Sequence, residues 1–356
     1  MSRTVRTLLA IVVVVSLHSC GGSAVSAAFT DSAGRAVQIP TGIKRVAPSG
    51  TVATMILATL APELMVSLSS PPTGAHYQYL PDILTRLPDT GQLYGTKGTL
   101  NLEAVMSTGA QLIIDMGDPK DGIASDLDSL QRQIGIPCIY IRADLNHMAC
   151  AYRTLGRLLG KEAKAEAIAA LIDETVLLAK RNSARIPDGE RVSVMFGTGP
   201  TGLNANARGS IHAQVIELVG AENAVMAKNV NHKGGGNTIN MEQLYMFNPD
   251  VILLAPGGPF DLLRSDRAWS ELAAVKNGTF YEIPGAPYNW LAGPPSVNMV
   301  LGVWWLGNLL YPQVYDYDMA SVAQRIFKLF WDYDLTREEA AAMLGRSTGK
   351  VLKRSM

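Results

Sequence analysis

The sequence predicts an α/β protein built from two similar lobes. The first observation is an internal duplication, in which residues 101–117 and 240–256 both read as a short helix followed by an apolar strand. The two copies place a glutamate at the same position, Glu103 and Glu242, with an offset of 139 residues. Strands also alternate with helices along both halves of the chain, a pattern typical of mostly parallel sheets. A long helix at 161–184 separates the copies, so we expect it to connect the two lobes.

The N-terminus reads as an export signal. Arg3 and Arg6 precede the segment 8–17, which is apolar except for one serine and is too short to anchor the chain by spanning a bilayer. We therefore expect residues 1–19 to be a signal peptide that the mature protein lacks.

Cleavage of this signal has two interpretations. The residues Leu-His-Ser-Cys-Gly at 17–21 resemble a bacterial lipobox, in which Cys20 would be lipidated and 20–28 would form a flexible tether. Small residues at 25–27 alternatively favour ordinary cleavage after Ala27, which would release a soluble protein. Both interpretations predict an exported protein, either anchored in the cell membrane through Cys20 or periplasmic.

The N-terminal lobe is assigned to residues 29–160. A polar turn between two strand-like runs predicts a hairpin at its start, and the Ala-Pro pair after Leu60 ends the first apolar helix. In chain order, the expected elements are a hairpin at 29–40, a strand within 44–50, a helix at 51–60, a strand at 66–69, the first repeat unit at 101–117, a helix at 123–134 and a strand at 138–141.

The connecting helix at 161–184 follows a helical stretch that starts at His147 and is interrupted at Gly160. Apolar residues recur at helical spacing and no proline occurs before Pro187, so the connector would extend about 35 Å. A single long helix is stiff, and a stiff connector limits how far two lobes can close.

The C-terminal lobe is assigned to residues 185–312, and a helical segment to 313–356. The expected elements are a strand at 191–196, a Gly-rich loop at 197–210, a helix at 211–218, the second repeat unit at 240–256, an apolar helix at 297–310 and two terminal helices within 320–345. Thr336 and Glu339 have the spacing of a capping box that would start the last helix.

Composition disfavours polyanionic partners. Lys plus Arg and Asp plus Glu both total 31, and no basic cluster occurs, so nucleic acid is a disfavoured partner. Hydrophobic residues make up 47% of the chain and charged residues 17%, which is typical of globular proteins. Cys138 and Cys150 lack metal-binding spacing, and their positions leave a disulfide between them open.

No motif for catalysis stands out. The chain has no GxSxG nucleophile, no HExxH zinc pair and no carboxylate pair placed for acid–base work. Gly197, Gly199 and Gly202 fit the dinucleotide fingerprint, but polar, aperiodic residues follow them where that site needs a helix N-terminus. We interpret these glycines as part of an ordinary loop and expect the protein not to be an enzyme.

Aromatic residues gather in Pro- and Gly-rich connections after predicted strands, the edge at which open α/β sheets take ligands. They are Tyr77, Tyr79, Tyr94, Tyr288 and Trp290. Each alone is explained as a half-buried loop anchor, whereas the set could stack on a planar ligand. A phenolate or an imidazole could also coordinate a hard metal such as Fe(III), and His76 and His232 lie in loops of the same kind.

The paired glutamates have a local explanation. Glu103 and Glu242 each follow an asparagine that can cap a helix, so interaction with the helix dipole explains either residue alone. It does not explain why both lobes present a carboxylate at the same position.

Several segments, taken in order, resemble a known family. They are TDSAGRAVQIP, KRVAPSGTVATMILATL, NLEAVMSTGAQLII, LGRLLGKEAKAEA, GSIHAQVIELVGAENAV and NMEQLYMFNPDVILL. Within 29–310 they are similar to the substrate-binding proteins of ABC importers for iron complexes and vitamin B12. The resemblance implies two Rossmann-like lobes joined by a single long α-helix, the helical-backbone type of metal-chelate receptor, with the ligand in a shallow cleft between the lobes.

The same resemblance implies the partners. In such proteins a glutamate at each lobe tip pairs with arginines of the importer's permease, and Glu103 and Glu242 match those glutamates. One departure is Ala-Gln at 110–111, where the family has Pro-Asp, while the second copy keeps Pro-Asp at 249–250. We expect a monomer that works with the permease and its ATPase and reaches the membrane through a lipid anchor.

The resemblance also suggests ligand residues. Members that hold ferric catecholates use a histidine and a tyrosine from C-terminal-lobe loops, which correspond to His232 and Tyr288 as metal-contacting residues. Lys97 and Arg208 would join them at an anionic ligand. The residues expected along its apolar faces are Tyr77, Tyr94 and Trp290. The expected ligand is a metal chelate such as a ferric siderophore, with haem, cobalamin or a nickel chelate as alternatives, and no cofactor is expected.

Two other function classes stay open. Related lobes occur in metal-inserting chelatases, so a two-lobed enzyme is one alternative, although an exported chain without an acid–base pair favours a binding protein. A ligand-sensing module of a membrane receptor is the other, and neighbouring genes for a permease and an ATPase would favour transport over it.

Overall fold

The computed structural model describes residues 26–71, 74–94, 98–231 and 235–347 of the 356-residue chain. The predicted signal peptide, the lipidation candidate Cys20 and the ligand candidates Lys97 and His232 lie outside these residues. None of the helices formed by the described residues combines the length and the apolar character needed to cross a membrane.

The N-terminal lobe is built on a parallel sheet of three strands in the order β3-β4-β5. The strands are β3 (Val46–Pro48), β4 (Leu112–Gly117) and β5 (Cys138–Arg142). β4 is buried along its whole length, and its side chains alternate between two cores. Ile114 belongs to the core shared with α1 (Thr51–Leu60), and Ile113 belongs to the core shared with α3 (Ile123–Ile134). Helices therefore cover both faces of this sheet, as parallel sheets require.

The C-terminal lobe has a sheet in the order β11-β10-β6-β7-β9, and β8 also pairs with β6. Its strands are β6 (Ser193–Thr198), β7 (Asn204–Ala205), β8 (Glu222–Asn223), β9 (Asn237–Thr238), β10 (Val251–Leu254) and β11 (Phe280–Glu282). The pairs that β6 forms with β8 and β10, and that β10 forms with β11, are parallel. β7 is antiparallel to its neighbours β6 and β9, so the sheet is mixed at that side.

Both copies of the repeated unit fold as predicted. α2 (Leu102–Ser107) leads into β4, and α7 (Met241–Phe247) leads into β10. Each connection contains one residue with left-handed backbone, Gly109 with φ 64° and Asn248 with φ 41°. Glycine and asparagine tolerate this conformation best, so the duplication has kept the same turn geometry with different residues.

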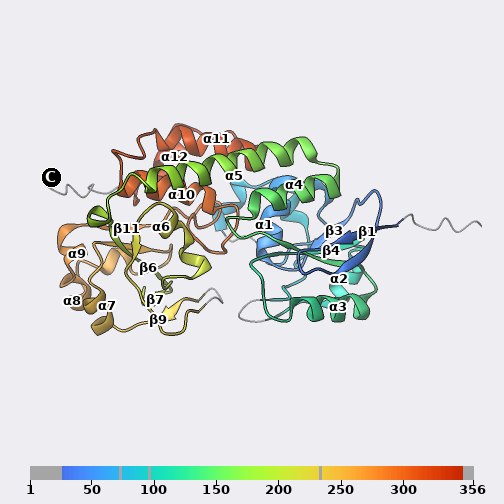
Figure 1. Ribbon diagram of the computed structural model, residues 1–356, viewed down its shortest axis with the longest axis horizontal. Coiled ribbons are helices and arrows are strands. Elements are labelled where there is room, and N and C mark those ends of the chain that lie inside the picture. The colour runs from blue at the N-terminus through green and yellow to red at the C-terminus, as the bar shows by residue number, and fades with distance from the viewer. Residues whose placement is uncertain (1–25, 72–73, 95–97, 232–234, 348–356) are drawn as a thin grey trace, which may run out of the picture.

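A long helix, α5 (Glu162–Ser183), follows the N-terminal sheet in sequence and precedes the C-terminal one. It packs against α4 (Met148–Leu159) on one side and against α10 (Met299–Leu310) on the other. The indole Nε1 of Trp304 donates a hydrogen bond to Thr175 Oγ1 of α5 at 2.8 Å. Figure 1 shows α5 running along both lobes, on the side of the molecule opposite α2 and α7.

The C-terminal segment contacts both lobes. It forms α11 (Met319–Trp331) and α12 (Arg337–Leu344), and the predicted capping box of Thr336 and Glu339 is present at the start of α12. The backbone N–H of Glu282 in β11 donates to the carbonyl of Arg346 at 3.2 Å, which holds the chain just after α12 on the C-terminal lobe.

Short elements complete the fold. They are α6 (Gln214–Leu218), α8 (Arg267–Ser270), α9 (Ala273–Asn277), and the 3-10 turns η1 (Pro62–Leu64), η2 (Gly74–Tyr79), η3 (Asp82–Arg86), η4 (Asp188–Glu190), η5 (Ile211–Ala213) and η6 (Phe260–Leu262).

Two sequence predictions in the N-terminal lobe are wrong in detail. The segment 66–69 forms no strand, because the chain there makes only single bridges, from Met65 to Val46 and from Leu68 to Asp89. The hairpin starts earlier than expected: β1 (Ser26–Thr30) pairs with β2 (Ala36–Pro40). Part of the predicted flexible tether is therefore strand, which its small residues did not indicate.

Candidate functional site

The two lobes meet where η2 of the N-terminal lobe approaches the loop 284–290 that follows β11. The ring atom Cε1 of His76 lies 3.9 Å from the position that a Cβ atom on Gly285 would take. That glycine is itself close to Pro256, whose Cγ would be 2.8 Å from such a Cβ. Residues from both lobes thus share one seam at the carboxyl ends of β10 and β11, the edge of an α/β sheet where ligands bind.

His76 is the most conspicuous polar group at the seam. Its Nδ1 is buried and has no hydrogen-bond partner among the described residues. A buried polar atom without a partner costs free energy unless a ligand, an ion or water satisfies it. The sequence marked His76 as a loop histidine that could contact a ligand, but its approach to the second lobe could not be predicted from the sequence.

An aromatic cluster packs against the last residue of the η2 turn, Tyr79. The ring centroid of Tyr79 lies 5.7 Å from that of Phe327 in α11 and 5.2 Å from that of Tyr333, with edge-on geometry in both pairs. Tyr79 is buried and serves as the anchor that the sequence interpretation allowed for it. The anchor fixes η2 and leaves Tyr77, two residues earlier, half-buried at the seam.

Tyr77 and Tyr288 are brought together by the fold. Burial raises the pKa of the Tyr288 phenol above its ordinary value, and the nearby Tyr77 hydroxyl raises it further. The phenol is therefore protonated at neutral pH. The seam therefore contains a phenol from each lobe and the imidazole of His76, which are donor types that bind Fe(III).

Trp290 does not line a ligand surface, which corrects the sequence prediction. Its side chain is 0% exposed and lies within the main hydrophobic core. Its Nε1 donates to the carbonyl of Ala286 at 2.8 Å, and its backbone N–H donates to the carbonyl of Pro284 at 3.0 Å. Trp290 thus fixes the loop that carries Tyr288.

Tyr94 belongs to a different cluster, at the carboxyl end of β4. Its hydroxyl donates to Asp126 Oδ2 at 2.8 Å, and the Nζ of Lys120 lies 4.7 Å from its ring centroid. The same Nζ lies 3.6 Å from Asp115 Oδ2 in β4. Ser49 donates a hydrogen bond to the other carboxylate oxygen, Oδ1.

Asp115 is a charged residue inside a buried strand. Burial raises the pKa of its carboxyl, and the charge of Lys120 opposes that rise. The side chain of Lys120 is 28% exposed, so its ammonium group is both held by Asp115 and open to solvent. Sequence reasoning missed Lys120, although an aspartate within an apolar strand signals a buried partner of opposite charge.

The remaining predicted ligand residues are separate from the seam or are not described. Arg208 is exposed, and its Nη2 donates to the carbonyl of Asn223 at 3.1 Å. No described contact joins it to Tyr77 or Tyr288. Lys97 and His232 lie outside the described residues.

Glu103 and Glu242 are both exposed in the first turn of their helices. Neither carboxylate forms an ion pair or a hydrogen bond within the described residues. The expected caps are present: Asn101 Oδ1 accepts from the N–H of Ala104 at 3.0 Å, and Asn240 Oδ1 accepts from the N–H of Gln243 at 2.8 Å.

The departure at 110–111 keeps the local hydrogen-bonding role that Asp250 has in the second copy. Gln111 Oε1 accepts hydrogen bonds from the backbone N–H groups of Lys44 and Arg45, at 2.7 and 3.1 Å. In the second copy, Asp250 Oδ2 accepts from the N–H of Ser193 at 2.9 Å. Both acceptors hold the chain at the start of the neighbouring strand.

Two further expectations concern the loop after β6 and the cysteines. A turn and the antiparallel strand β7 follow β6 directly, so no helix N-terminus follows the glycines at 197–202. Gly199 and Gly202 lie in the loop that we predicted, whereas Gly197 belongs to β6, which extends two residues beyond the predicted strand. Cys138 is buried and Cys150 is exposed, and both are free. The described residues contain no group of three or more His, Cys, Asp or Glu side chains that could hold a metal ion by themselves.

Two α/β lobes that meet at the carboxyl ends of their strands are an architecture suited to a bilobal solute-binding protein. The comparison with known families agrees: residues 86–287 match the periplasmic binding protein family Peripla_BP_2, and the chain belongs to this family. Binding proteins of this family serve ABC importers.

Individual relatives extend this result. The chain is 24% identical over 232 residues to YhfQ of Bacillus subtilis (strain 168), which is named as an ABC transporter substrate-binding lipoprotein; the match covers 62% of this chain and 70% of YhfQ. A solved ABC transporter solute-binding protein from Sulfurospirillum deleyianum DSM 6946 is similar at a TM-score of 0.82 and 25% identity, over 89% of this chain and 99% of that chain. MolA of Haemophilus influenzae, solved with molybdate, is similar in fold at a TM-score of 0.72 and 18% identity, over 87% of this chain and 99% of that chain.

Proposed function

We propose that this protein captures a metal chelate, with a ferric chelate as the leading candidate, and delivers it to the permease of an ABC importer. The observation that carries the proposal is the seam, where His76 and Tyr77 of one lobe approach Gly285 and Tyr288 of the other. A ligand bound there would touch both lobes.

The chemistry of the seam favours a metal-bearing ligand. An imidazole and phenolates are suitable ligands for Fe(III), and the buried, unsatisfied Nδ1 of His76 would gain a partner when a metal binds. His76 and Tyr288 are therefore our preferred metal-contacting pair, with His232 retained from the sequence prediction as a second imidazole. Because three side-chain donors do not fill an octahedral coordination sphere, a chelator must supply the others.

Three basic residues are our candidates for contact with an anionic chelator. Lys120 lies at the carboxyl end of β4 with part of its ammonium group open to solvent. Arg208 lies on a loop of the C-terminal lobe and is exposed. Together with Lys97, these cations would favour catecholate or carboxylate groups around the metal. Tyr77 and Tyr94 would contact the apolar parts of the ligand.

Delivery would use the two exposed glutamates. Glu103 and Glu242 lie on α2 and α7, on the same side of the molecule in Figure 1, and neither is neutralised by a described residue. Such carboxylates can pair with arginines of a permease. A lipid on Cys20 would keep the chain near its importer, and export with cleavage after Ala27 is the alternative.

Ligand titrations test the proposal directly. The mature chain is titrated with a ferric tris-catecholate, haem, cobalamin and nickel–histidine, and binding is followed by quenching of its tryptophan fluorescence. We expect the ferric chelate to bind most tightly and to gain a charge-transfer band from phenolate coordination. If none of the metal-bearing compounds bound, the proposed cargo class would be wrong.

A further inference from the structure

We propose that the two lobes dock on the permease through contacts of opposite shape, a hollow beside Glu103 and a projecting methionine beside Glu242. This inference rests on the proposed importer function. It adds what the partner surfaces must look like, which the two glutamates alone do not specify.

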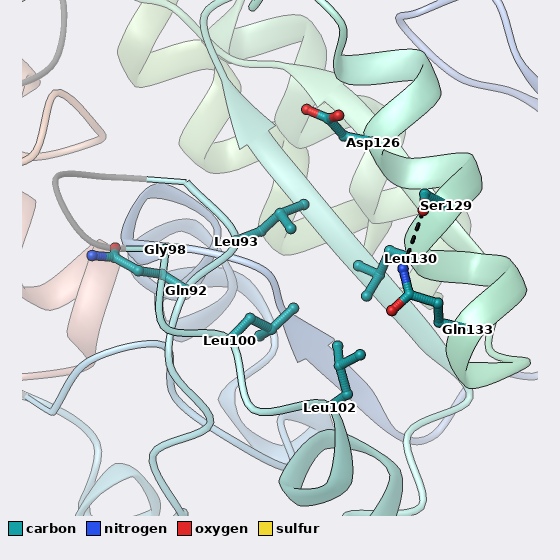
Figure 2. Close-up of a pocket in the computed structure, with 9 residues that line it drawn as sticks. All are labelled: Gln92, Leu93, Gly98, Leu100, Leu102, Asp126, Ser129, Leu130 and Gln133. Carbon is teal, nitrogen blue, oxygen red and sulfur yellow. Dashed lines mark hydrogen bonds between the residues drawn. The ribbon is translucent and has the colours of Figure 1, made fainter.

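The hollow lies in the N-terminal lobe between α3 and the chain that enters α2. It has a volume of about 350 Å³. Figure 2 shows Leu93, Leu100 and Leu102 pointing toward α3, from which Leu130 points back toward them. Polar side chains form the rim, where Gln133 Nε2 donates to Ser129 Oγ at 3.1 Å in α3. The hollow therefore has an apolar floor and a polar rim, like the centre of a protein–protein contact.

The hollow lies next to the predicted docking residue, Glu103. Leu102, which lines it, is the first residue of α2, and the exposed Glu103 is the next. A partner that brings a basic group to Glu103 would reach the hollow with an adjacent apolar side chain. A volume of this size admits a leucine or a phenylalanine side chain, whose apolar surface would be removed from water on docking.

The C-terminal lobe offers a projection at the equivalent helix. Met246 in α7 is 83% exposed, the most exposed large apolar side chain in the described part of the chain. Tyr245 beside it is 41% exposed, and its hydroxyl donates to the carbonyl of Ala268 at 2.6 Å, which fixes its ring on the surface. Both residues lie within one turn of Glu242 on the same short helix.

Exposed apolar side chains are concentrated on these two helices. The described part of the chain has six large apolar residues that are strongly exposed, and three of them, Met106, Tyr245 and Met246, belong to α2 and α7. Met106 and Tyr245 occupy equivalent positions of the duplication, each three residues after its glutamate. Because a helix places residues i and i+3 on one face, each lobe presents a carboxylate and an apolar group together. The same combination arises twice, which supports a shared partner.

The partner must therefore be complementary in charge and shape. At the N-terminal lobe it presents a basic side chain for Glu103 and a protruding apolar side chain for the hollow. At the C-terminal lobe it presents a basic side chain for Glu242 and a recess for Met246. The chain would dock in one orientation only, because a projection cannot replace a hollow.

Binding of the mature chain to its permease–ATPase complex in lipid nanodiscs tests the inference. Ser129→Trp fills the hollow, and Met246→Ser removes the projection. We expect each variant to bind the transporter about 10-fold more weakly, as loss of a central interface contact does. Arg132→Trp, at an exposed position of α3 outside the hollow, and Leu177→Ser, on α5, are matched controls that should change affinity less than about 2-fold.

The outcomes separate this inference from the proposed function. Thermal melts exclude unfolded variants, and Gln133→Trp, on the exposed rim, replaces Ser129→Trp if that variant is unstable. Weaker binding of both the hollow and the projection variants supports the inference. If either variant bound like the parent while reversal of the glutamates abolished binding, the inference would be overturned and docking through Glu103 and Glu242 would stand. If reversal of the glutamates left transporter binding unchanged, the proposed docking function itself would fail.

Discussion

The helices α2 and α7 are alike in their caps and in one exposed glutamate, whereas the strands that follow them, β4 and β10, differ at their carboxyl ends. Each helix has an asparagine cap and an exposed glutamate in its first turn. Each also buries one apolar residue at the equivalent position, Val105 and Leu244.

The two strands differ at one buried position. Asp115 of β4 corresponds to Leu254 of β10 in the duplication, and both side chains are buried. The aspartate requires a neutralising partner and has Lys120, while the leucine requires none. The edge of the N-terminal sheet is therefore charged, and the edge of the C-terminal sheet is apolar at the matching position.

This difference is expected if the two copies share the task of docking on the permease but differ in how they contact the ligand. The carboxylates that would meet the permease are retained in both copies, because both lobes would face one transporter. Side chains at the carboxyl ends of the two strands have diverged, as expected if one ligand presents different groups to each lobe. The predictions below test whether the division between a shared docking surface and a lobe-specific cleft is correct.

The largest effect is expected for docking. Reversal of both carboxylates, Glu103→Lys with Glu242→Lys, should lower uptake by at least about 100-fold and leave ligand affinity unchanged, because each lysine would repel the arginine that the carboxylate attracts. Uptake is measured in proteoliposomes that contain the permease–ATPase complex. The control replaces two exposed glutamates on other elements by lysine, Glu190→Lys with Glu338→Lys, and should retain uptake. Equal losses in both double variants would contradict a specific docking role.

The second effect concerns the seam. His76→Ala with Tyr288→Phe should weaken binding of a ferric chelate by about 100-fold, because both metal-contacting groups are removed. The matched control is His147→Ala with Tyr317→Phe, which changes the same residue types away from the seam. Fluorescence titration gives both affinities. Unchanged affinity of the seam variant would exclude these residues as metal contacts.

Much of the fold was predictable because its signals are local. The bounds of α1 and α3 equal the predicted ranges. An apolar period of 3.6 residues identifies each helix, and a Pro or Gly soon after the last residue marks its end. The duplicated unit was equally clear, as cap, helix, turn and strand follow one another within 17 residues. The segment 66–69 was wrongly predicted as a strand, because strand-forming residues do not show whether a neighbouring strand can pair with them.

The site was harder to predict because its contacts join distant segments. His76 and Gly285 are separated by about 200 residues, and nothing near either residue indicates that they approach each other. Trp290 was misjudged for the opposite reason, since an aromatic residue in a Pro- and Gly-rich loop looks exposed although its ring enters the core. Lys120 was missed because the ion pair with Asp115 forms only when the loop after β4 folds back.

The third effect is a pH dependence that belongs to one lobe. Burial raises the pKa of Tyr288, so the apo protein holds a neutral phenol, and coordination of a metal by the phenolate releases that proton. Affinity for a ferric chelate should rise with pH between 6 and 9, by up to about 10-fold per unit if one proton is released. Tyr288→Phe should lose this slope, whereas Tyr94→Phe in the other lobe should keep it. The same slope in the parent and in Tyr288→Phe would show that the proton comes from elsewhere.

The fourth effect tests the charged edge of the N-terminal lobe. Lys120→Met should destabilise the protein by about 1–2 kcal/mol, because it leaves the carboxylate of Asp115 buried without a cation, although the exposure of Lys120 moderates the loss. Adding Asp115→Asn should restore most of the stability, since the amide is neutral and can still bond to Ser49. Urea denaturation gives the free energy of unfolding for each variant. If the second substitution restored nothing, the loss would not be due to the unpaired charge.

The smallest effect concerns the shared caps. Asn101→Ala and Asn240→Ala should each cost about 1 kcal/mol, because each leaves one backbone N–H of the first turn without its side-chain acceptor. In α7 the side chain of Gln243 would still bond to the N–H of residue 240, so the rest of its capping box survives. Asn→Asp at either position keeps an acceptor and should cost less than Asn→Ala. Urea denaturation with an unchanged m-value measures all four variants. Similar losses of unfolding free energy at both helices would support caps that hold two equivalent carboxylates in place. A loss at only one helix would mean that the copies already differ on the surface proposed to be shared.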